Sequence, residues 1–295
     1  MALFGKLEGN DIETKAPVAR PFWHQLLVIP EATLLLALLI IGWAFNFPVF
    51  ISLLIVLIIG AFVVRLLLLS TATQRLQRGA YSQADRLSGM ALRMNPWSVD
   101  TLHVRAESFV MRGDDIQAEP FLRRAVALAP QRHVVHATMT AMLLEQGEIE
   151  QAQVLLEKSR QGEELSPAAV QQLAWYTLHV EGNPRGAQLL VEGAYPEQLA
   201  EPVAVALLVT LAESELALHN TTGLARTLGE INQRLPLCSS PQQAELHFHL
   251  GRLESAMGRD ARGHFRQSVA LDPQGRYARQ AWRNAIGNTT LDDVA

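Results

Sequence analysis

The residues that could carry out chemistry are two close histidine pairs and one cysteine. His133 and His136 are three residues apart, His247 and His249 are two apart, and Cys238 is the only cysteine in the chain. A zinc site needs a third and a fourth ligand at suitable spacing, and neither pair has a cysteine or a Glu-x-x-His companion. A cysteine nucleophile needs a base, and none lies near Cys238 in the sequence. We therefore predict no metal site, no catalytic residue and no cofactor.

Motifs that bind nucleotides or activate a serine are absent from the sequence. There is no phosphate loop of the form G-x-x-x-x-G-K-[ST], no G-x-G-x-x-G after a strand, and no G-x-S-x-G. The formal net charge is −4, whereas a dedicated nucleic-acid-binding protein normally carries a strongly basic face. The sequence predicts a protein that is not an enzyme and does not bind nucleic acid.

Two apolar spans, Leu26–Phe45 and Pro48–Leu69, precede every other element. Each is about 20 residues long, and a helix of that length crosses a hydrocarbon core of about 30 Å. A hairpin buried in a soluble core is the alternative, but ordinary cores rarely contain so long a run with so few charges. We predict a transmembrane helical hairpin over residues 22–70 that contacts the lipid bilayer. A flexible cytoplasmic tail over residues 1–21 precedes it.

Basic residues flank this hairpin on both sides and are missing from its tip. They are Lys6, Lys15 and Arg20 before it, and Arg65, Arg75 and Arg78 at its end and after it. Basic residues next to membrane spans remain on the cytoplasmic side. We therefore predict an integral protein of the cell (inner) membrane with both termini in the cytoplasm.

Glycine, alanine and proline recur with a period near 34 after residue 70. The columns are Gly79, Gly113 and Gly147; Ala84, Ala118 and Ala152; and Pro96 and Pro130. Glycine reverses the chain without strain, a small alanine lets two helices approach, and proline ends a helix. The pattern continues with Gly182 and Ala187, Asn220 and Ala225, and Gly258. Asn220 tolerates the left-handed turn conformation, so we expect it to replace glycine there.

These columns resemble the tetratricopeptide repeat (TPR) family, and "FRQSVALDP", from Phe265 to Pro273, is the closest single segment. The "HLGRL" segment from His249 to Leu253 is similar to the leucine–glycine pair of a first TPR helix. The resemblance implies an all-α protein in which about six helix–turn–helix units over residues 71–273 form an α-solenoid. A capping helix and a frayed C-terminus follow over residues 274–295. A hairpin followed by repeats is also similar in plan to HemY-type membrane proteins.

Three local features complete the helix predictions. Pro120 falls inside a second helix, so we expect that helix to begin late or to bend. We expect the second span to continue into the first repeat as one helix. Tyr277, Trp282 and Ile286 are the large apolar side chains of the expected capping helix.

The TPR resemblance also implies a binding groove. Such arrays bind an extended or helical peptide along the concave face made by the first helix of each unit. The corresponding positions here are His103, Glu107, Gln172, Tyr176, His179, Phe248 and Arg252. Tyr176, His179 and Arg252 would offer hydrogen bonds, and Phe248 would stack on a partner. The basic cluster with which chaperone-binding members clamp a C-terminal carboxylate is not present.

Charge is unevenly distributed along the repeats. Residues 71–134 carry nine basic and six acidic side chains, a net charge of +3. Residues 135–245 carry five basic and fourteen acidic side chains, a net charge of −9. The basic segment suits an anionic cytoplasmic leaflet. The acidic segment is either a solvated helix surface or an attractive surface for a basic partner.

Two functions from different classes are consistent with these features. The first is a membrane-anchored TPR scaffold or adaptor that binds a partner protein at the cytoplasmic membrane face, for example during assembly of a membrane complex. The second is a permanent, non-catalytic subunit of a membrane enzyme or transporter, recognised through its hairpin. A scaffold would keep its partner without the native hairpin, whereas a subunit would lose its complex.

Overall fold

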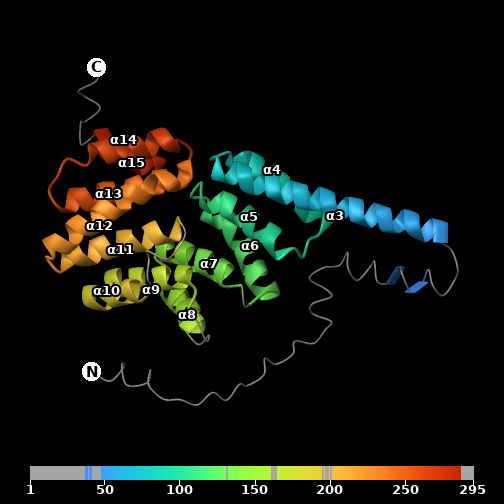
Figure 1. Ribbon diagram of the computed structural model, residues 1–295, viewed down its shortest axis with the longest axis horizontal. Coiled ribbons are helices and arrows are strands. Elements are labelled where there is room, and N and C mark those ends of the chain that lie inside the picture. Colours follow the sequence, from blue (N-terminus) through green and yellow to red (C-terminus); the bar gives the residue numbers. More distant parts are fainter. Residues whose placement is uncertain are drawn as a thin grey trace, which may run out of the picture. The chain divides into compact units, whose positions relative to one another are not determined.

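The computed structural model describes residues 37–38, 40–41, 48–130, 132–160, 165–194, 196, 199 and 201–286. Every regular element within them is a helix (Figure 1), so the predicted all-α class is confirmed for these residues. The chain divides into two compact units, Met1–Phe62 and Val63–Ala295.

Helix α3, Pro48–Gln77, contains the second predicted span and continues into the first repeat without a break, as expected. Among the described helices it alone is long and apolar enough to cross a membrane. Its large apolar side chains are exposed, for example Leu53, Val56 and Leu57. The tail over residues 1–21 and almost all of the first span, Leu26–Phe45, lie outside the described residues. The two-span hairpin therefore stays a prediction.

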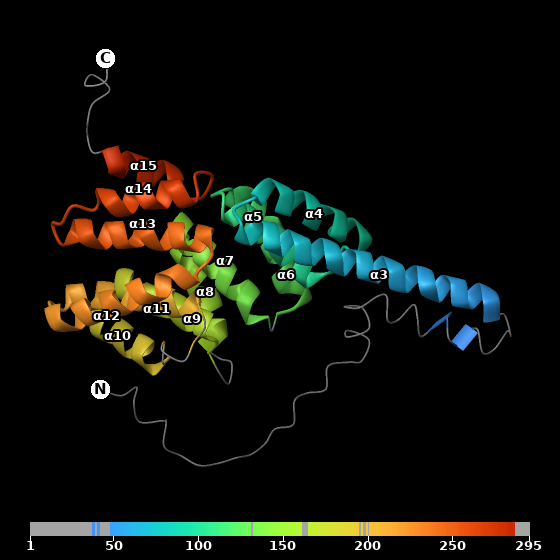
Figure 2. The same ribbon diagram turned by 45° about the horizontal axis from the view of Figure 1, so that its top comes forward.

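The unit Val63–Ala295 is a succession of helix pairs (Figures 1 and 2). The end of α3 pairs with α4, α5 with α6, α7 with α8, α9 with α10, α11 with α12, and α13 with α14. The bounds of the helices that follow α3 are Tyr81–Met94 (α4), Val99–Val110 (α5), Asp115–Leu128 (α6), His133–Gln146 (α7), Ile149–Arg160 (α8), Pro167–His179 (α9), Pro184–Gly193 (α10), Val203–Ala217 (α11), Thr221–Arg234 (α12), Leu235–Leu237 (the 3-10 helix η2), Ser240–Ala256 (α13), Arg262–Leu271 (α14) and Ala278–Ile286 (α15).

The turns inside five of these pairs contain a left-handed glycine, with φ between 64° and 78°. They are Gly79, Gly113, Gly147, Gly182 and Gly258. The prediction that Asn220 adopts this conformation is wrong. The left-handed residue is His219, with φ of 56°, one position earlier. Asn220 instead caps α12, because its Oδ1 accepts a hydrogen bond from the Gly223 N–H at 3.1 Å.

Small residues bring the two helices of four pairs together. Ala84, Ala118, Ala152 and Ala187 are completely buried, five residues after each turn glycine. In the fifth pair the corresponding residue is Leu224, which is buried, whereas Ala225 is exposed, because the turn residue is His219.

In the sixth pair a small residue of the first helix also makes room. Ala261 lies twelve residues before the closing Pro273, the spacing of the earlier alanines from their prolines, and it is buried. On α13 a Cβ atom at Gly251 would lie only 2.7 Å from Cε1 of Phe265. The glycine thus leaves space for the Phe265 ring.

Pro120 lies inside helix α6. The helix begins at Asp115 and continues through the proline, so it does not begin late, and the alternative that it bends stays an expectation. Its first turn closes upstream of the proline, where the N–H groups of Gln117 and Ala118 donate to the carbonyl of Asp114.

Helix α15 packs with buried Ala281 and Ala285, and leaves Trp282 and Ile286 exposed by 56% and 44%. The small side chains of these alanines allow α15 to lie close against α14.

The segment Asp272–Tyr277 between α14 and α15 contacts the first three helix pairs (Figure 2); we call it the clasp. The N–H of Arg276 donates to the carbonyl of Met111 at 2.8 Å, and its guanidinium donates to both carboxylate oxygens of Asp115 at 2.7 and 2.9 Å. The hydroxyl of Tyr277 donates to Glu145 at 2.8 Å, and the hydroxyl of Tyr81 donates to Asp272. In a simple solenoid each repeat contacts only its neighbours. Here the last repeat also contacts the first ones.

Candidate partner-binding cavity

The first helices of the second to sixth pairs line a cavity of about 340 Å³. One residue from each helix shows the periodicity of its wall. These residues are Glu107 on α5, Ala141 on α7, Trp175 on α9, Val209 on α11 and Glu245 on α13, at intervals of 34, 34, 34 and 36. The cavity therefore lies on the face that the repeat itself generates.

Small side chains leave this space open. Ala137 and Ala141 on α7, Ala168 on α9 and Ala206 on α11 all line the cavity. Larger residues such as Val110, Val203 and Leu246 complete its apolar wall. Close packing normally fills protein interiors, so a wall of alanines on three neighbouring helices produces a cavity.

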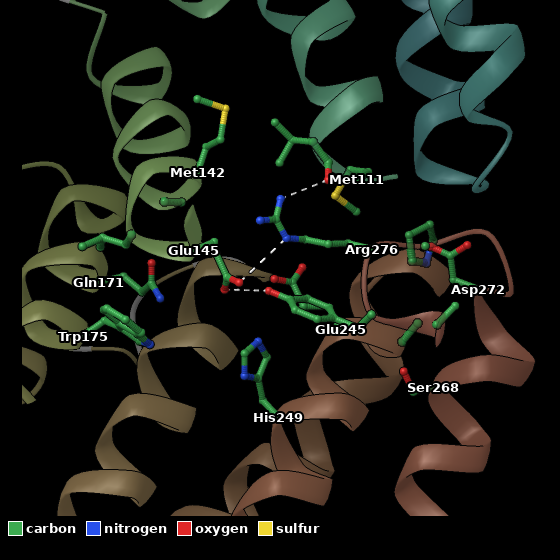
Figure 3. Close-up of a pocket in the computed structure, with 18 of the residues that line it drawn as sticks. Met111, Met142, Glu145, Gln171, Trp175, Glu245, His249, Ser268, Asp272 and Arg276 are labelled. Atoms are coloured by element: carbon green, nitrogen blue, oxygen red, sulfur yellow. Dashed lines mark hydrogen bonds and ion pairs between the residues drawn. The ribbon is translucent and has the colours of Figure 1, made fainter. Parts of the chain in front are cut away.

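A smaller cavity of about 140 Å³ shares part of this wall and extends to the clasp (Figure 3). Gln171 and Trp175 from α9 and His249 from α13 line both cavities. Figure 3 shows Glu145 directed towards Arg276, whose Nε lies 3.8 Å from its carboxylate. The clasp thus closes one end of the lined space.

Two carboxylates of the wall are held in an unfavourable environment. Burial, followed by the nearby charge of Glu245, raises the pKa of Glu107 to about 7. Burial is also the main reason why the pKa of Glu245 is raised, and the charge of Glu145 adds to it. A carboxylate with a raised pKa is one whose charge the protein stabilises less well than water does.

A third carboxylate, Glu213, is stabilised instead. Burial alone would raise its pKa, but the hydrogen bond from His179 outweighs this together with the charges of His179, His249 and Arg252. The net result is a lowered pKa. The Nε2 atom of His179 lies 3.1 Å from Oε2 of Glu213.

Five of the seven predicted groove residues lie on or next to this wall. Glu107 and Gln172 line the larger cavity directly. His103 lies behind it, with Nε2 3.0 Å from Oγ1 of the lining residue Thr138. His179 and Arg252 act on the wall through Glu213. Their role in binding stays a prediction.

The remaining two, Tyr176 and Phe248, are core residues with exposures of 9% and 1%. The ring of Phe248 stacks on Tyr277 at 4.5 Å between centroids. Both side chains pack in the core, and neither lines the larger cavity. Trp175 and His249, their immediate neighbours in the sequence, line the cavity in their place.

Two residues that the sequence analysis missed, Trp175 and Glu213, can be found by applying a strict period of 34. Steps of 34 from Glu107 lead to Ala141, Trp175 and Val209. Steps of 34 from Glu145 lead to His179 and Glu213. The uneven turns after Gly147 obscure this period, because insertions there change the length of the second helices and loops.

The histidine pairs and the cysteine have structural surroundings. His136 is buried, with Nε2 2.9 Å from the carbonyl of Pro130, and Nδ1 of His247 lies 2.9 Å from Nδ1 of His264. Cys238 is 7% exposed, and burial raises the pKa of its thiol. No group of three or more His, Cys, Asp or Glu side chains in the described residues is arranged to hold a metal ion.

Comparisons with known proteins identify the fold. No family model and no curated protein sequence matches the chain. Among solved structures, a chain of the APC/C hetero-tetramer Cut9–Hcn1 matches with a TM-score of 0.57 and 16% identity over 90% of this chain and 55% of that one. A tetratricopeptide repeat protein from Parabacteroides merdae matches with 0.54 and 12% identity, over 90% and 99%. PilW, a type IV pilus biogenesis factor, matches with 0.50 and 15% identity, over 75% and 99%.

These similarities define the class of the protein. Its repeats form a TPR-like α-solenoid, as the sequence predicted. The chain spans about half the length of its Cut9–Hcn1 match. At identities this low, the similarity concerns the fold alone.

Proposed function

We propose that this chain is a membrane-anchored scaffold that binds a partner protein in the cavity of its first helices, at the cytoplasmic face of the cell membrane. The observation that carries the proposal is the cavity, to which five successive first helices contribute. Its size and its mainly apolar wall with a few polar groups are typical of a binding site. In this role the protein is not an enzyme and needs no cofactor.

A protein partner fits the site better than a small substrate. The lining residues come from five repeats, so the site extends along the array instead of converging on one reacting atom. Two of the similar structures are named as an APC/C hetero-tetramer and a type IV pilus biogenesis factor. Assembly of a membrane complex is the task that we propose for this scaffold.

A basic surface on α4–α6 supports the membrane location. Arg86, Arg93, Arg105 and Arg124 line a shallow hollow there, and we call these four residues the arginine face. Next to it Met90, Met94 and Trp97 are exposed by 52%, 42% and 50%. Exposed apolar and aromatic side chains beside arginines are typical of a surface that contacts anionic headgroups.

Site-specific photo-crosslinking in native membranes tests the proposal. A photoreactive phenylalanine replaces Gln171, which lines both cavities, in the full chain. The matched control carries it at Gln153, an exposed glutamine on the second helix α8. We expect one protein, identified by mass spectrometry, to be attached at Gln171 and not at Gln153. The same adducts at both positions would contradict a specific cavity.

A third position addresses the alternative of a permanent subunit recognised through its hairpin. Leu57 on α3 is exposed by 66%, and among the described residues a Cβ atom at Gly60 would meet nothing within 4 Å, so this part of α3 suits a photoreactive probe. Adducts at Leu57 alone, lost when the spans are replaced by an unrelated hairpin, would favour the subunit over the scaffold.

A further inference from the structure

Two wall carboxylates, those of Glu107 and Glu245, lack a partner. Among the described residues, neither side chain forms a hydrogen bond or an ion pair. They lie on α5 and α13, at opposite ends of the row of first helices, and both line the larger cavity. Both side chains are half-buried, and desolvation makes a carboxylate without a hydrogen-bond partner costly, so these two groups are the least satisfied acidic groups of the cavity wall.

The other acidic groups near the cavity are already engaged. Glu145 accepts a hydrogen bond from Tyr277 and lies 3.8 Å from Arg276, and Glu213 interacts with His179 at 3.1 Å. Among the described residues, no lysine or arginine lines the larger cavity, and Arg276 at its edge forms two hydrogen bonds with Asp115. The charges of His249 and Arg276 favour the ionised form of Glu245, but burial outweighs them and its pKa stays raised.

We propose that the cavity accepts a lysine or arginine side chain from an apolar segment of the partner protein, held between Glu107 and Glu245. The inference rests on the proposed function and specifies the chemistry of the partner. The apolar wall, with Val110, Val209 and Leu246, would surround the aliphatic stem of the side chain, and the carboxylates would receive its charged end. The charge of −9 over residues 135–245 would attract a basic segment to this face.

Proton release is a consequence of this arrangement. In the free protein the pKa of Glu107 is about 7 and that of Glu245 is raised, so both carboxyls bind protons readily. A bound cation favours the ionised forms and lowers these pKa values. The complex then holds fewer protons than the free protein, so affinity should increase as pH rises from about 6 to about 8.

Other titratable or charged groups face these carboxylates and must be separated from them. They are His103 on α5, Glu145 on α7, Glu213 on α11, His249 on α13, Tyr81 on α4, and Arg276 and Tyr277 in the clasp; α9 contributes only uncharged residues to the cavity. His249 lines the same cavity and its charge acts on Glu245, so its contribution must be separated from that of the carboxylates. A His249→Gln variant should therefore keep the pH dependence.

The test uses two small probes that differ in charge and little in shape, n-butylguanidinium and neutral n-butylurea. The full chain in nanodiscs carries fluorinated tryptophan, and the ¹⁹F resonance of Trp175, assigned with Trp175→Phe, reports occupation of the cavity. At pH 8 we expect n-butylguanidinium to bind about tenfold more tightly than n-butylurea, as a charge-assisted hydrogen bond would provide. The preference should decrease severalfold at pH 6, both in the unaltered chain and in His249→Gln.

A matched set of variants identifies the groups responsible. Glu107→Gln with Glu245→Gln should abolish the preference for the cation, whereas Glu150→Gln, on the second helix α8, should retain it. Equal binding of both probes, no response of Trp175 to the cation, or a preference that survives the double variant would overturn the inference. The pH series on the unaltered chain keeps the test valid if a variant folds poorly. A failure here leaves the proposed scaffold intact if the photoreactive group at Gln171 still captures its partner.

Discussion

Gly251 is a residue at which the packing of two helices is tightly determined. A methyl group there would lie 2.7 Å from Cε1 and 3.0 Å from Cδ1 of Phe265, so the ring must move. We expect Gly251→Ala to destabilise the protein by about 1–3 kcal/mol through overpacking. Chemical unfolding followed by circular dichroism measures this effect.

Two further variants make the interpretation of Gly251→Ala specific. Gly229 is an exposed glycine on α12, and a Cβ atom added there would meet nothing within 4 Å, so Gly229→Ala should stabilise the protein by up to about 1 kcal/mol. Phe265→Leu should recover part of the loss in Gly251→Ala, because the two side chains share one space. An unaltered unfolding midpoint in Gly251→Ala would show that α13 and α14 separate easily.

At this scale the sequence predicts residue types better than their exact positions. The alanine columns at Ala84, Ala118 and Ala152 are buried as predicted, because a small residue at a close helix crossing has few alternatives. Tyr176 and Trp175 could not be distinguished, since both are large and aromatic and a helix turns about 100° between them. Only the packing of neighbouring repeats decides which of them enters the core.

The arginine face leads to a prediction for helix α4. Each basic side chain near an anionic membrane surface contributes about 1 kcal/mol. For the full chain in nanodiscs, we expect amide hydrogen exchange in α4 to be slower with anionic lipid than with neutral lipid. Replacing Arg86, Arg93 and Arg124 with glutamine should remove this difference; Arg105 is left in place because it pairs with Asp85 at 3.1 Å.

The control for this measurement carries the same loss of charge elsewhere. Arg262, Arg266 and Arg279 on α14 and α15 are replaced with glutamine, and exchange in α4 should keep its dependence on lipid charge. If exchange in α4 ignores lipid composition in the unaltered chain, the arginine face does not contact the membrane.

Helices were the most predictable part of this protein. Glycine turns, prolines and an amphipathic pattern recur with one period, so each repeat supports the prediction of the next. The limits of single helices were less predictable, as Pro120 shows, because a first turn that is closed by its own hydrogen bonds tolerates a proline after it.

The clasp couples the ends of the array, and its removal should change how the whole molecule unfolds. Arg276→Ala would leave Asp115, whose side chain is 14% exposed, without its cation; we expect a loss of about 2–4 kcal/mol. Repeats that contact only their neighbours can unfold separately. We therefore expect the unaltered chain to unfold in urea in one transition, and Arg276→Ala to show two, when helical circular dichroism and tryptophan fluorescence are compared.

A matched control is Arg262→Ala, which removes an exposed arginine paired with Asp260 two residues away. This variant should unfold like the unaltered chain. If circular dichroism and fluorescence report the same transition in Arg276→Ala, the clasp does not couple the ends of the array.

Closure of the array could not be predicted from the sequence. Tyr81 and Asp272 are 191 positions apart, and Arg276 and Asp115 are 161 apart. Neither separation is part of the repeat, and the residues belong to different segments of their units. The acidic character of the middle repeats was visible in the sequence, but the unpaired state of Glu107 and Glu245 depends on where the clasp places Arg276.

Because Cys238 is buried, the reactivity of its thiol reports local opening of the structure around it. A thiol that is 7% exposed and has a raised pKa reacts slowly with alkylating reagents as long as the junction of α12 and α13 remains packed. Because the chain contains no other cysteine, every modification event records a transient separation at that junction. The alkylation rate of Cys238 therefore measures how often the solenoid opens locally at this junction. A partner that rigidifies the array would lower this rate.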